Sequence, residues 1–156
     1  MVELVELIEK GMFHKSDYQT KEDYFEGTFH ILFKDSKVNN EFLHAICERE
    51  RNYPTGMRVN DINVAIPHSE HQYVNEEAII IDVFKNPVVF QNIENPEEKI
   101  EVSISFMLLL TKSHSHLRAL QQLMILFQDN EVLQKIINCS CKEEVIEVIN
   151  ELNLNN

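Results

Sequence analysis

One stretch organises the rest of this chain, and it is Asn63-Val64-Ala65-Ile66-Pro67-His68-Ser69-Glu70. Val64 and Ile66 flank an alanine, a pattern typical of a buried strand. Pro67 has no backbone N–H to donate to a sheet, so we expect strand pairing to end there. His68 would then lie just beyond a strand end, where the loops of an α/β sheet usually carry ligands and reactive side chains.

Further strands are predicted on the C-terminal side of this stretch. Residues 77–84 are rich in β-branched side chains and predict a strand, and residues 87–90 predict a shorter one. Residues 100–110 alternate apolar and polar side chains and then become apolar on both faces, which indicates a central strand. Residues 2–9 alternate only loosely and fit a strand or one helical turn.

Amphipathic helices are expected between and after these strands. Thr20 can cap a helix over about 21–34, and Asn39 or Asn40 can cap a second one that ends near Arg51. Ser113 or Ser115 can cap a helix with a buried stripe from Leu117 to Phe127. Asp129 or Asn130 can cap a short helix through Ile137, and the capping box at 140–143 opens a last helix. Both N-terminal helices would cover a sheet.

Composition and charge narrow the classes of function. The 156 residues fit one domain with a substantial core, and the net charge of −12 makes nucleic acid a poor partner. Acidic residues stand at the N-terminus where a secretory signal would carry bases, and the apolar run 106–110 is too short to span a bilayer. Without a signal peptide, we interpret Cys47, Cys139 and Cys141 as reduced thiols of a cytoplasmic protein.

Three polar side chains are predicted at helix or strand ends: Arg49, His68 and His116. A neutral imidazole is a nucleophile near physiological pH, which makes His68 a candidate for covalent catalysis. A phosphoryl group on its nitrogen would need cationic or N–H partners. An arginine side chain and the N-terminus of a helix, where His116 would lie, supply such partners. The three residues therefore fit a phosphohistidine site.

A metal site is the competing interpretation. His68 with His71, and His114 with His116, offer four imidazoles, which is enough for zinc. No HExxH pattern is present, however, and His68 follows a proline in a predicted loop. The three glycines are too scattered for a phosphate-binding loop, and no G-x-S-x-G motif occurs. The remaining histidines, His14, His30 and His44, are predicted within or beside helices as surface or satisfied side chains.

Several motifs together resemble one family. In order they are Arg49-Glu50, Pro54-Thr55-Gly56, Val64-Ala65-Ile66-Pro67-His68, Phe106-Met107-Leu108-Leu109, and His116-Leu117 followed by Leu120. Over roughly residues 17–150 the chain resembles the enzyme IIA (EIIA) domain of the bacterial sugar phosphotransferase system (PTS), fructose/mannitol type (type 2). Pro-Thr-Gly followed by Ala-Ile-Pro-His is the specific part. The sequence around Glu50 and Glu70 is nearest the galactitol-like branch. Ser69 stands where a glycine is common in fructose and mannitol members.

The resemblance implies a single α/β domain with a mixed β-sheet flanked by helices. It implies that His68 is phosphorylated, on Nε2, by the phosphorylated histidine phosphocarrier protein, with Arg49 in support. Because some galactitol-like members lack the second histidine, His116 is expected to be supportive at most. The phosphoryl group would pass to a cysteine of enzyme IIB and then to sugar during uptake through the membrane component IIC. No cofactor, metal or nucleotide is implied.

The same resemblance allows a second function. A regulatory EIIA-like module would bind a target protein according to the phosphorylation state of His68. Because the chain starts at Met1 without an appended domain, it is expected to be a free-standing cytoplasmic component. The sugar is not identified, because an EIIA touches only other proteins.

Overall fold

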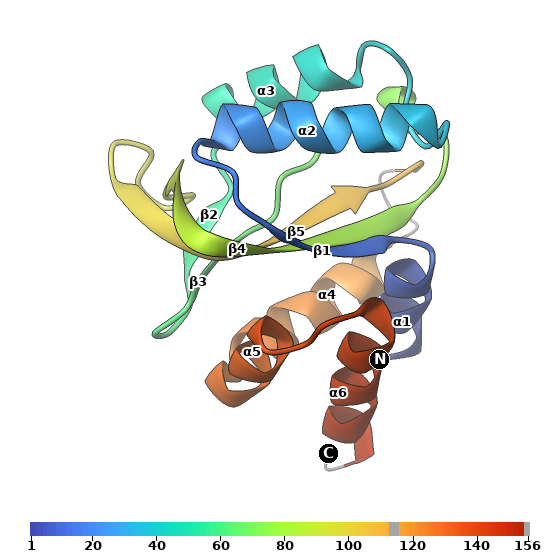
Figure 1. Ribbon diagram of the computed structural model, residues 1–156, viewed down its shortest axis with the longest axis vertical. Coiled ribbons are helices and arrows are strands. Elements are labelled where there is room, and N and C mark those ends of the chain that lie inside the picture. The colour runs from blue at the N-terminus through green and yellow to red at the C-terminus, as the bar shows by residue number, and fades with distance from the viewer. Residues whose placement is uncertain (113–115, 155–156) are drawn as a thin grey trace.

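The structure, a computed structural model, describes residues 1–112 and 116–154, and the side chains of residues 1–112 and 116–152. In this part of the chain a five-stranded mixed sheet lies between two layers of helices (Figure 1). The strand order is β1-β4-β5-β3-β2, with β1 parallel to β4, β3 parallel to β5, and the other neighbours antiparallel. The strands are β1 (Met12–Ser16), β2 (Gly56–Arg58), β3 (Asn63–Ala65), β4 (Ala78–Gln91) and β5 (Lys99–Leu109). The predicted α/β fold with a mixed sheet is confirmed.

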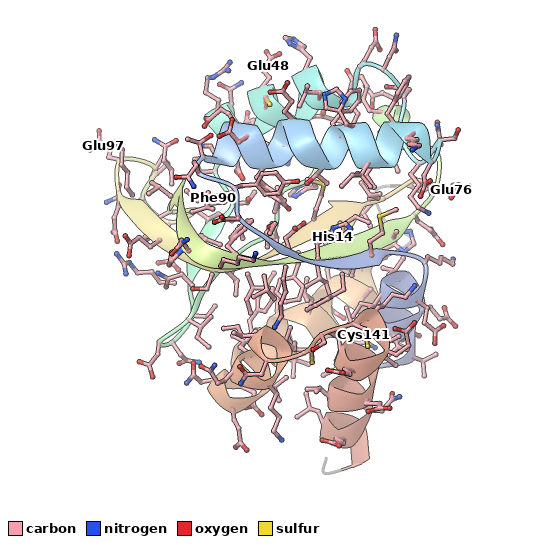
Figure 2. The ribbon with its side chains drawn as sticks, in the orientation of Figure 1. His14, Glu48, Glu76, Phe90, Glu97 and Cys141 are labelled. Atoms are coloured by element: carbon pink, nitrogen blue, oxygen red, sulfur yellow. The ribbon has the colours of Figure 1, made fainter. Side chains whose placement is uncertain are left out.

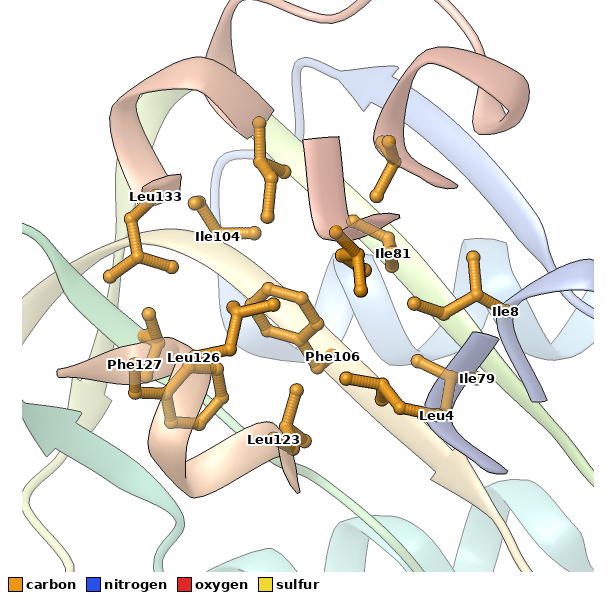
Figure 3. Packing of buried hydrophobic residues seen from close by; sticks show 14 of the residues in the cluster. Leu4, Ile8, Ile79, Ile81, Ile104, Phe106, Leu123, Leu126, Phe127 and Leu133 are labelled. Atoms are coloured by element: carbon orange, nitrogen blue, oxygen red, sulfur yellow. The ribbon is translucent and has the colours of Figure 1, made fainter. Parts of the chain in front are cut away.

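Each face of the sheet has its own hydrophobic core. Figure 1 shows α2 and α3 on one face and α1, α4, α5 and α6 on the other. Alternate residues of β4 contribute to the two cores, since Ile80 packs under α2 and α3 while Ile79 and Ile81 pack against the other helices. Figure 3 shows the second of these clusters, in which Phe106 contacts Phe127 with ring centroids 5.1 Å apart. The helices are α1 (Val2–Glu9), α2 (Lys21–Lys34), α3 (Phe42–Asn52), α4 (Leu117–Phe127), α5 (Asn130–Ile137) and α6 (Lys142–Leu154), with a 3₁₀ turn η1 (His71–Tyr73).

The local signals for helix starts are largely confirmed. Thr20 Oγ1 accepts a hydrogen bond from the Asp23 N–H at 3.0 Å, and α2 covers the predicted residues. Asp129 caps α5 in the same way through the Val132 N–H. Asn39 does not cap α3 directly. Its side chain accepts from the Glu41 N–H, and the helix begins at Phe42. The predicted caps Ser113 and Ser115 lie outside the described residues.

One open alternative is decided, and two predictions about elements are corrected. Residues 2–9 form a helix, since Leu4, Leu7 and Ile8 are buried together against α4 and α6. The two strands predicted at 77–84 and 87–90 are one long strand, β4, whose pairing with β5 is irregular between Val83 and Val88. A short edge strand, β1, follows α1 and carries His14, which had been predicted within or beside a helix.

No helix in residues 1–112 or 116–154 combines the length and the apolar character that crossing a membrane would need.

Candidate active site

His68 lies at the end of β3, beside the central strand β5. The Leu108 N–H donates to the Pro67 carbonyl oxygen at 3.0 Å, and His68 forms an isolated parallel bridge with Leu108. The expectation that pairing ends at Pro67 is therefore wrong, because proline lacks a donor but keeps its acceptor. This hydrogen bond and the bridge hold the backbone of Pro67 and His68 against β5. The half-buried ring is thus held on a rigid support at the rim of the sheet.

The tautomer of His68 is set by its own backbone. Nδ1 lies 2.8 Å from the carbonyl oxygen of Ile66. A carbonyl oxygen only accepts, so Nδ1 carries the proton and donates it. In the neutral ring Nε2 then holds the lone pair, and the one hydrogen bond that the described residues give this ring is at Nδ1. Nε2 is therefore the nucleophilic atom of His68.

The surroundings of His68 favour the neutral ring. Burial is the largest effect and lowers the pKa of His68 below its ordinary value, and the positive charge of Arg49 acts in the same direction. The Ile66 carbonyl and Glu70 oppose this shift only in part. At neutral pH the imidazole is thus uncharged and able to attack an electrophile.

Arg49 shares a surface pocket with His68. The pocket has a volume of about 300 Å³, and its lining combines the end of α3, the following turn and the β4–β5 connection. The lining residues are Arg49, Asn52, Tyr53, Pro54, Thr55, His68, Ile93 and Pro96. The structure thus brings together two of the three residues predicted from the sequence. It adds an apolar rim of Tyr53, Ile93 and Pro96 that sequence reasoning missed, because this rim comes from segments far apart in the chain.

The guanidinium of Arg49 is held on two sides. Its Nη1 donates to Glu70 Oε1 at 3.2 Å, and its Cζ lies 5.5 Å from the centroid of the Tyr53 ring. Its Nε is buried and has no hydrogen-bond partner among the described residues. An unpaired buried donor beside a nucleophilic histidine is suited to an anion, because an anion would satisfy it.

His116 lies at the same end of the sheet but on the other side of β5. It is the residue before α4, and its Nε2 is 2.6 Å from Glu77 Oε2, just before β4. The contact is close but poorly aligned, since this Nε2 has no hydrogen-bond partner in the described residues. His116 lines a second pocket with Glu77 and Lys10. No described contact joins His116 to His68, so the structure does not bring the third predicted residue to the nucleophile.

A buried acid stands behind the pocket. Glu50 is only 2% exposed, and its Oε1 accepts a hydrogen bond from Thr55 Oγ1 at 2.5 Å. Burial raises the pKa of Glu50 to about 7, against the opposing effects of Thr55, Lys21 and Arg49. Both residues belong to the motifs found in the sequence, since Glu50 follows Arg49 and Thr55 precedes Gly56. Their spacing alone does not predict that the two side chains are hydrogen-bonded.

Gly56 is explained by close packing and not by a need for an unusual backbone conformation. Its φ is not positive, and a Cβ built on it would lie 2.6 Å from the Gln91 carbonyl oxygen. Any side chain would push β2 away from the end of β4. The Ile93 N–H also donates to the Gly56 carbonyl at 2.8 Å, so this contact fixes the rim residue Ile93.

The metal interpretation gains no support in the part of the chain that can be tested. Among the described residues, no group of three or more His, Cys, Asp or Glu side chains could hold a metal ion. His114, one of the four imidazoles considered, lies outside the described residues.

Comparison with known proteins gives consistent results. The model of the family described as "Phosphoenolpyruvate-dependent sugar phosphotransferase system, EIIA 2" matches residues 7–152. The fold is similar to that of a PTS IIA protein, PtxA, from Streptococcus mutans, with a TM-score of 0.73 at 20% identity over 97% of this chain and 93% of that one. It is also similar to the nitrogen regulatory protein IIA-Ntr from Neisseria meningitidis, with a TM-score of 0.69 at 22% identity over 94% and 98%.

A third similar structure is a complex from Escherichia coli. It contains the mannitol enzyme IIA with phosphorylated enzyme IIB. The TM-score is 0.68 at 17% identity, over 89% of this chain and 94% of that one. At these identities the likeness concerns the fold.

Proposed function

The chain belongs to the EIIA 2 family of the phosphoenolpyruvate-dependent sugar phosphotransferase system, and from this premise we propose that His68 carries the phosphoryl group. The donor is the phosphorylated histidine phosphocarrier protein, and the acceptor is an enzyme IIB. One observation carries the proposal: Nδ1 of His68 donates to the Ile66 carbonyl, which leaves Nε2 as the nucleophile.

Transfer exchanges one phosphorus–nitrogen bond for another. Nε2 of His68 attacks the phosphorus as the bond to the carrier's histidine breaks, and the electron pair of that bond returns to the carrier's ring. No proton has to leave His68, because Nε2 was unprotonated. The phosphorylated ring gains positive character, which strengthens the bond from Nδ1–H to the Ile66 carbonyl.

Arg49 is suited to the negative charge of the phosphoryl group. Its buried Nε needs a partner, and its guanidinium can bind two oxygens of one anion with fixed geometry. Glu70 competes for the same guanidinium, but both side chains are partly exposed, so breaking this pair costs little. His116 would take part only after leaving Glu77.

The second half of the relay passes the phosphoryl group to enzyme IIB and, through it, to sugar entering by the membrane component IIC. The E. coli complex shows that another protein of this fold binds a phosphorylated IIB. We also propose that the chain is nearest the galactitol-like branch, on the sequence around Glu50 and Glu70. In the structure both residues accept hydrogen bonds at the site. Glu50 accepts from Thr55, and Glu70 accepts from Arg49.

A regulatory role is the alternative, and the similarity of fold to a nitrogen regulatory IIA keeps it open to test. Both roles use His68. A panel of IIB proteins, including a galactitol IIB, separates them, because a transport component passes its phosphate to one IIB far faster than to the others.

Phosphorylation of His68 is tested with the phosphorylated carrier protein. Wild type should take up one phosphate, which is labile to acid and stable to base. His68→Ala should take up none, while His71→Ala serves as the control, since His71 is an exposed imidazole three residues further on. If His68→Ala is phosphorylated at the wild-type rate, His68 is not the acceptor.

A further inference from the structure

The pair formed by Glu50 and Thr55 has no part in the relay described above, although it lies at the wall of the site. Thr55 lines the same pocket as His68 and Arg49, and Glu50 lies behind it, almost wholly buried. One oxygen of Glu50 is bonded to Thr55, and the other, Oε2, has no hydrogen-bond partner in the part of the chain that the structure describes. A half-satisfied buried carboxyl is costly, and this one lies directly behind a wall of the pocket that holds the nucleophile.

The direction of the bond between these two residues depends on one proton. When Glu50 is ionised it can only accept, so the Thr55 hydroxyl donates to it, and the distance of 2.5 Å fits such a charge-assisted bond. Thr55 Oγ1 then offers only lone pairs to the pocket. When Glu50 is protonated, its O–H can donate to Thr55 Oγ1, and the threonine proton is free to donate elsewhere.

We propose that the Thr55 hydroxyl donates a hydrogen bond to the phosphoryl group on His68, and that protonation of Glu50 switches this donor on. The inference rests on the proposed function, since it assumes that His68 carries phosphate. Thr55 would be a catalytic residue, and Glu50 a positioning residue that acts through it. The arriving phosphoryl group brings negative charge, and Glu50 takes up one proton from solvent. Apart from this protonation, the only bonds that change are the two phosphorus–nitrogen bonds exchanged in the transfer.

The charges around Glu50 allow this switch near neutral pH. Burial is the dominant effect and favours the protonated form, while Lys21 on α2 and Arg49 on α3 favour the ionised form. The Thr55 hydroxyl and backbone N–H also favour the ionised form, and Tyr24 on α2 is a further titratable neighbour. These effects place the pKa of Glu50 at about 7, so both forms exist at neutral pH.

The first test compares wild type with Glu50→Gln. The amide of glutamine donates permanently to Thr55, as the protonated acid does. Transfer from the phosphorylated carrier is measured for both proteins between pH 6 and pH 8, and the ratio of the two rates cancels every titration they share. The ratio of Glu50→Gln to wild type should rise about tenfold over this range, as wild type loses its protonated form. A flat ratio overturns the switch.

A matched pair of Thr55 variants isolates the hydroxyl. Thr55→Ser keeps the hydroxyl and should retain the pH-dependent ratio. Thr55→Val removes it with little change in shape, so Glu50→Gln should give no pH-dependent gain in the Thr55→Val background. A purely structural bond would change the stability of these variants and leave the ratio independent of pH. A gain that persists in Thr55→Val overturns the role of the hydroxyl.

A second measurement uses the wild-type protein and does not depend on the folding of Glu50→Gln. Carbon-13 NMR of the Glu50 carboxyl gives its pKa before and after phosphorylation. Because the coupling is reciprocal, phosphorylation should raise this pKa, and the rise should shrink in Thr55→Val. No rise, or an equal rise in Thr55→Val, overturns the inference. If wild-type His68 takes up no phosphate at all, the proposed function itself fails, which is a distinct result.

Discussion

Glu70 Oε1 accepts a hydrogen bond from Arg49 Nη1 at 3.2 Å, and this pair links the end of α3 to the loop that follows His68. The guanidinium is thereby held at the wall of the pocket before any phosphoryl group arrives. Both side chains keep contact with solvent, so the pair contributes about 0–1 kcal/mol and is readily exchanged. In the proposed relay, Glu70 is a replaceable partner that keeps the guanidinium of Arg49 at the wall of the pocket.

Removing Arg49 should slow phosphoryl transfer without preventing it. Arg49→Ala is expected to lower the rate from the carrier by about ten- to a thousandfold, because one charged donor is lost in the transition state. Arg49→Lys should recover little, since an ammonium cannot bind two oxygens with fixed geometry. Arg51→Ala, two positions along the same helix and exposed, is the matched control. A wild-type rate in Arg49→Ala would remove Arg49 from the site.

The participation of His116 can be measured through its partner. Glu77 holds His116 Nε2 at 2.6 Å, so Glu77→Gln should release the imidazole and raise the transfer rate severalfold if His116 assists the phosphoryl group. The same change in a His116→Ala background should have no effect, which also controls for loss of the ion pair between Glu77 and Lys10. Equal effects in both backgrounds would show that Glu77→Gln does not act through His116.

His14 should make stability depend on pH. The Asp82 carboxylate, 3.9 Å away, raises the pKa of His14 above its unfolded value, so the pair stabilises the fold below about pH 6.5. That contribution is lost as the pH rises through the raised pKa. Figure 2 shows His14 at the sheet, on the side that α2 covers. Urea unfolding should therefore show a larger loss of stability for His14→Gln at pH 6 than at pH 8.5.

The control for this prediction removes the charge of the partner. In Asp82→Asn, the pH dependence of the His14→Gln effect should disappear. An equal loss of stability at both pH values in the wild-type background would instead mean that His14 contributes by packing alone.

Docking on the His68 pocket should depend on apolar contact more than on charge. Tyr53 and Ile93 on its rim are 67% and 44% exposed. Ile93→Ser should lower kcat/KM for the carrier about three- to tenfold, as expected for loss of an apolar anchor. Figure 2 shows the control residue, Glu97, at the outer end of the connection between β4 and β5. Glu97→Gln should have a smaller effect.

Ionic strength gives an independent measure of the same surface. Raising salt severalfold should change the transfer rate only modestly. The acids of the β4–β5 connection are not among the residues that line the pocket, although Glu97 directly follows Pro96 on its rim. A steep loss of rate with salt would mean that these acids make the interface.

The sequence was most informative where the causes of structure are local. Thr20 and Asp129 cap helices through bonds to residues three positions away, and both helix starts were predicted correctly. The extent of β4 depends on its antiparallel neighbour β5, so local composition suggested two strands. The edge strand β1 is short, and none of its five residues is fully buried, so only its pairing with β4 identifies it as a strand.

For the site, the sequence predicted the residues that its motifs contain. His68 and Arg49 meet at one pocket, as expected. The partner of His116 and the protonation of Glu50 could not be inferred, because both depend on distances across the sheet and on burial. Glu77 meets His116 from 39 positions away, and no spacing rule relates them.

The alternation along β4 and β5 limits how this family can change in length. Side chains of Ile79 and Ile80 enter different cores, and Leu108 fixes the backbone at His68. A single inserted residue near the middle of β5 would exchange the two faces beyond it and remove the Leu108 N–H from its place opposite the Pro67 carbonyl oxygen. One residue more or less in the connection at residues 92–98 would not exchange the two faces of a strand. Gains and losses of residues should therefore concentrate there, where they would alter partner choice while leaving the chemistry intact.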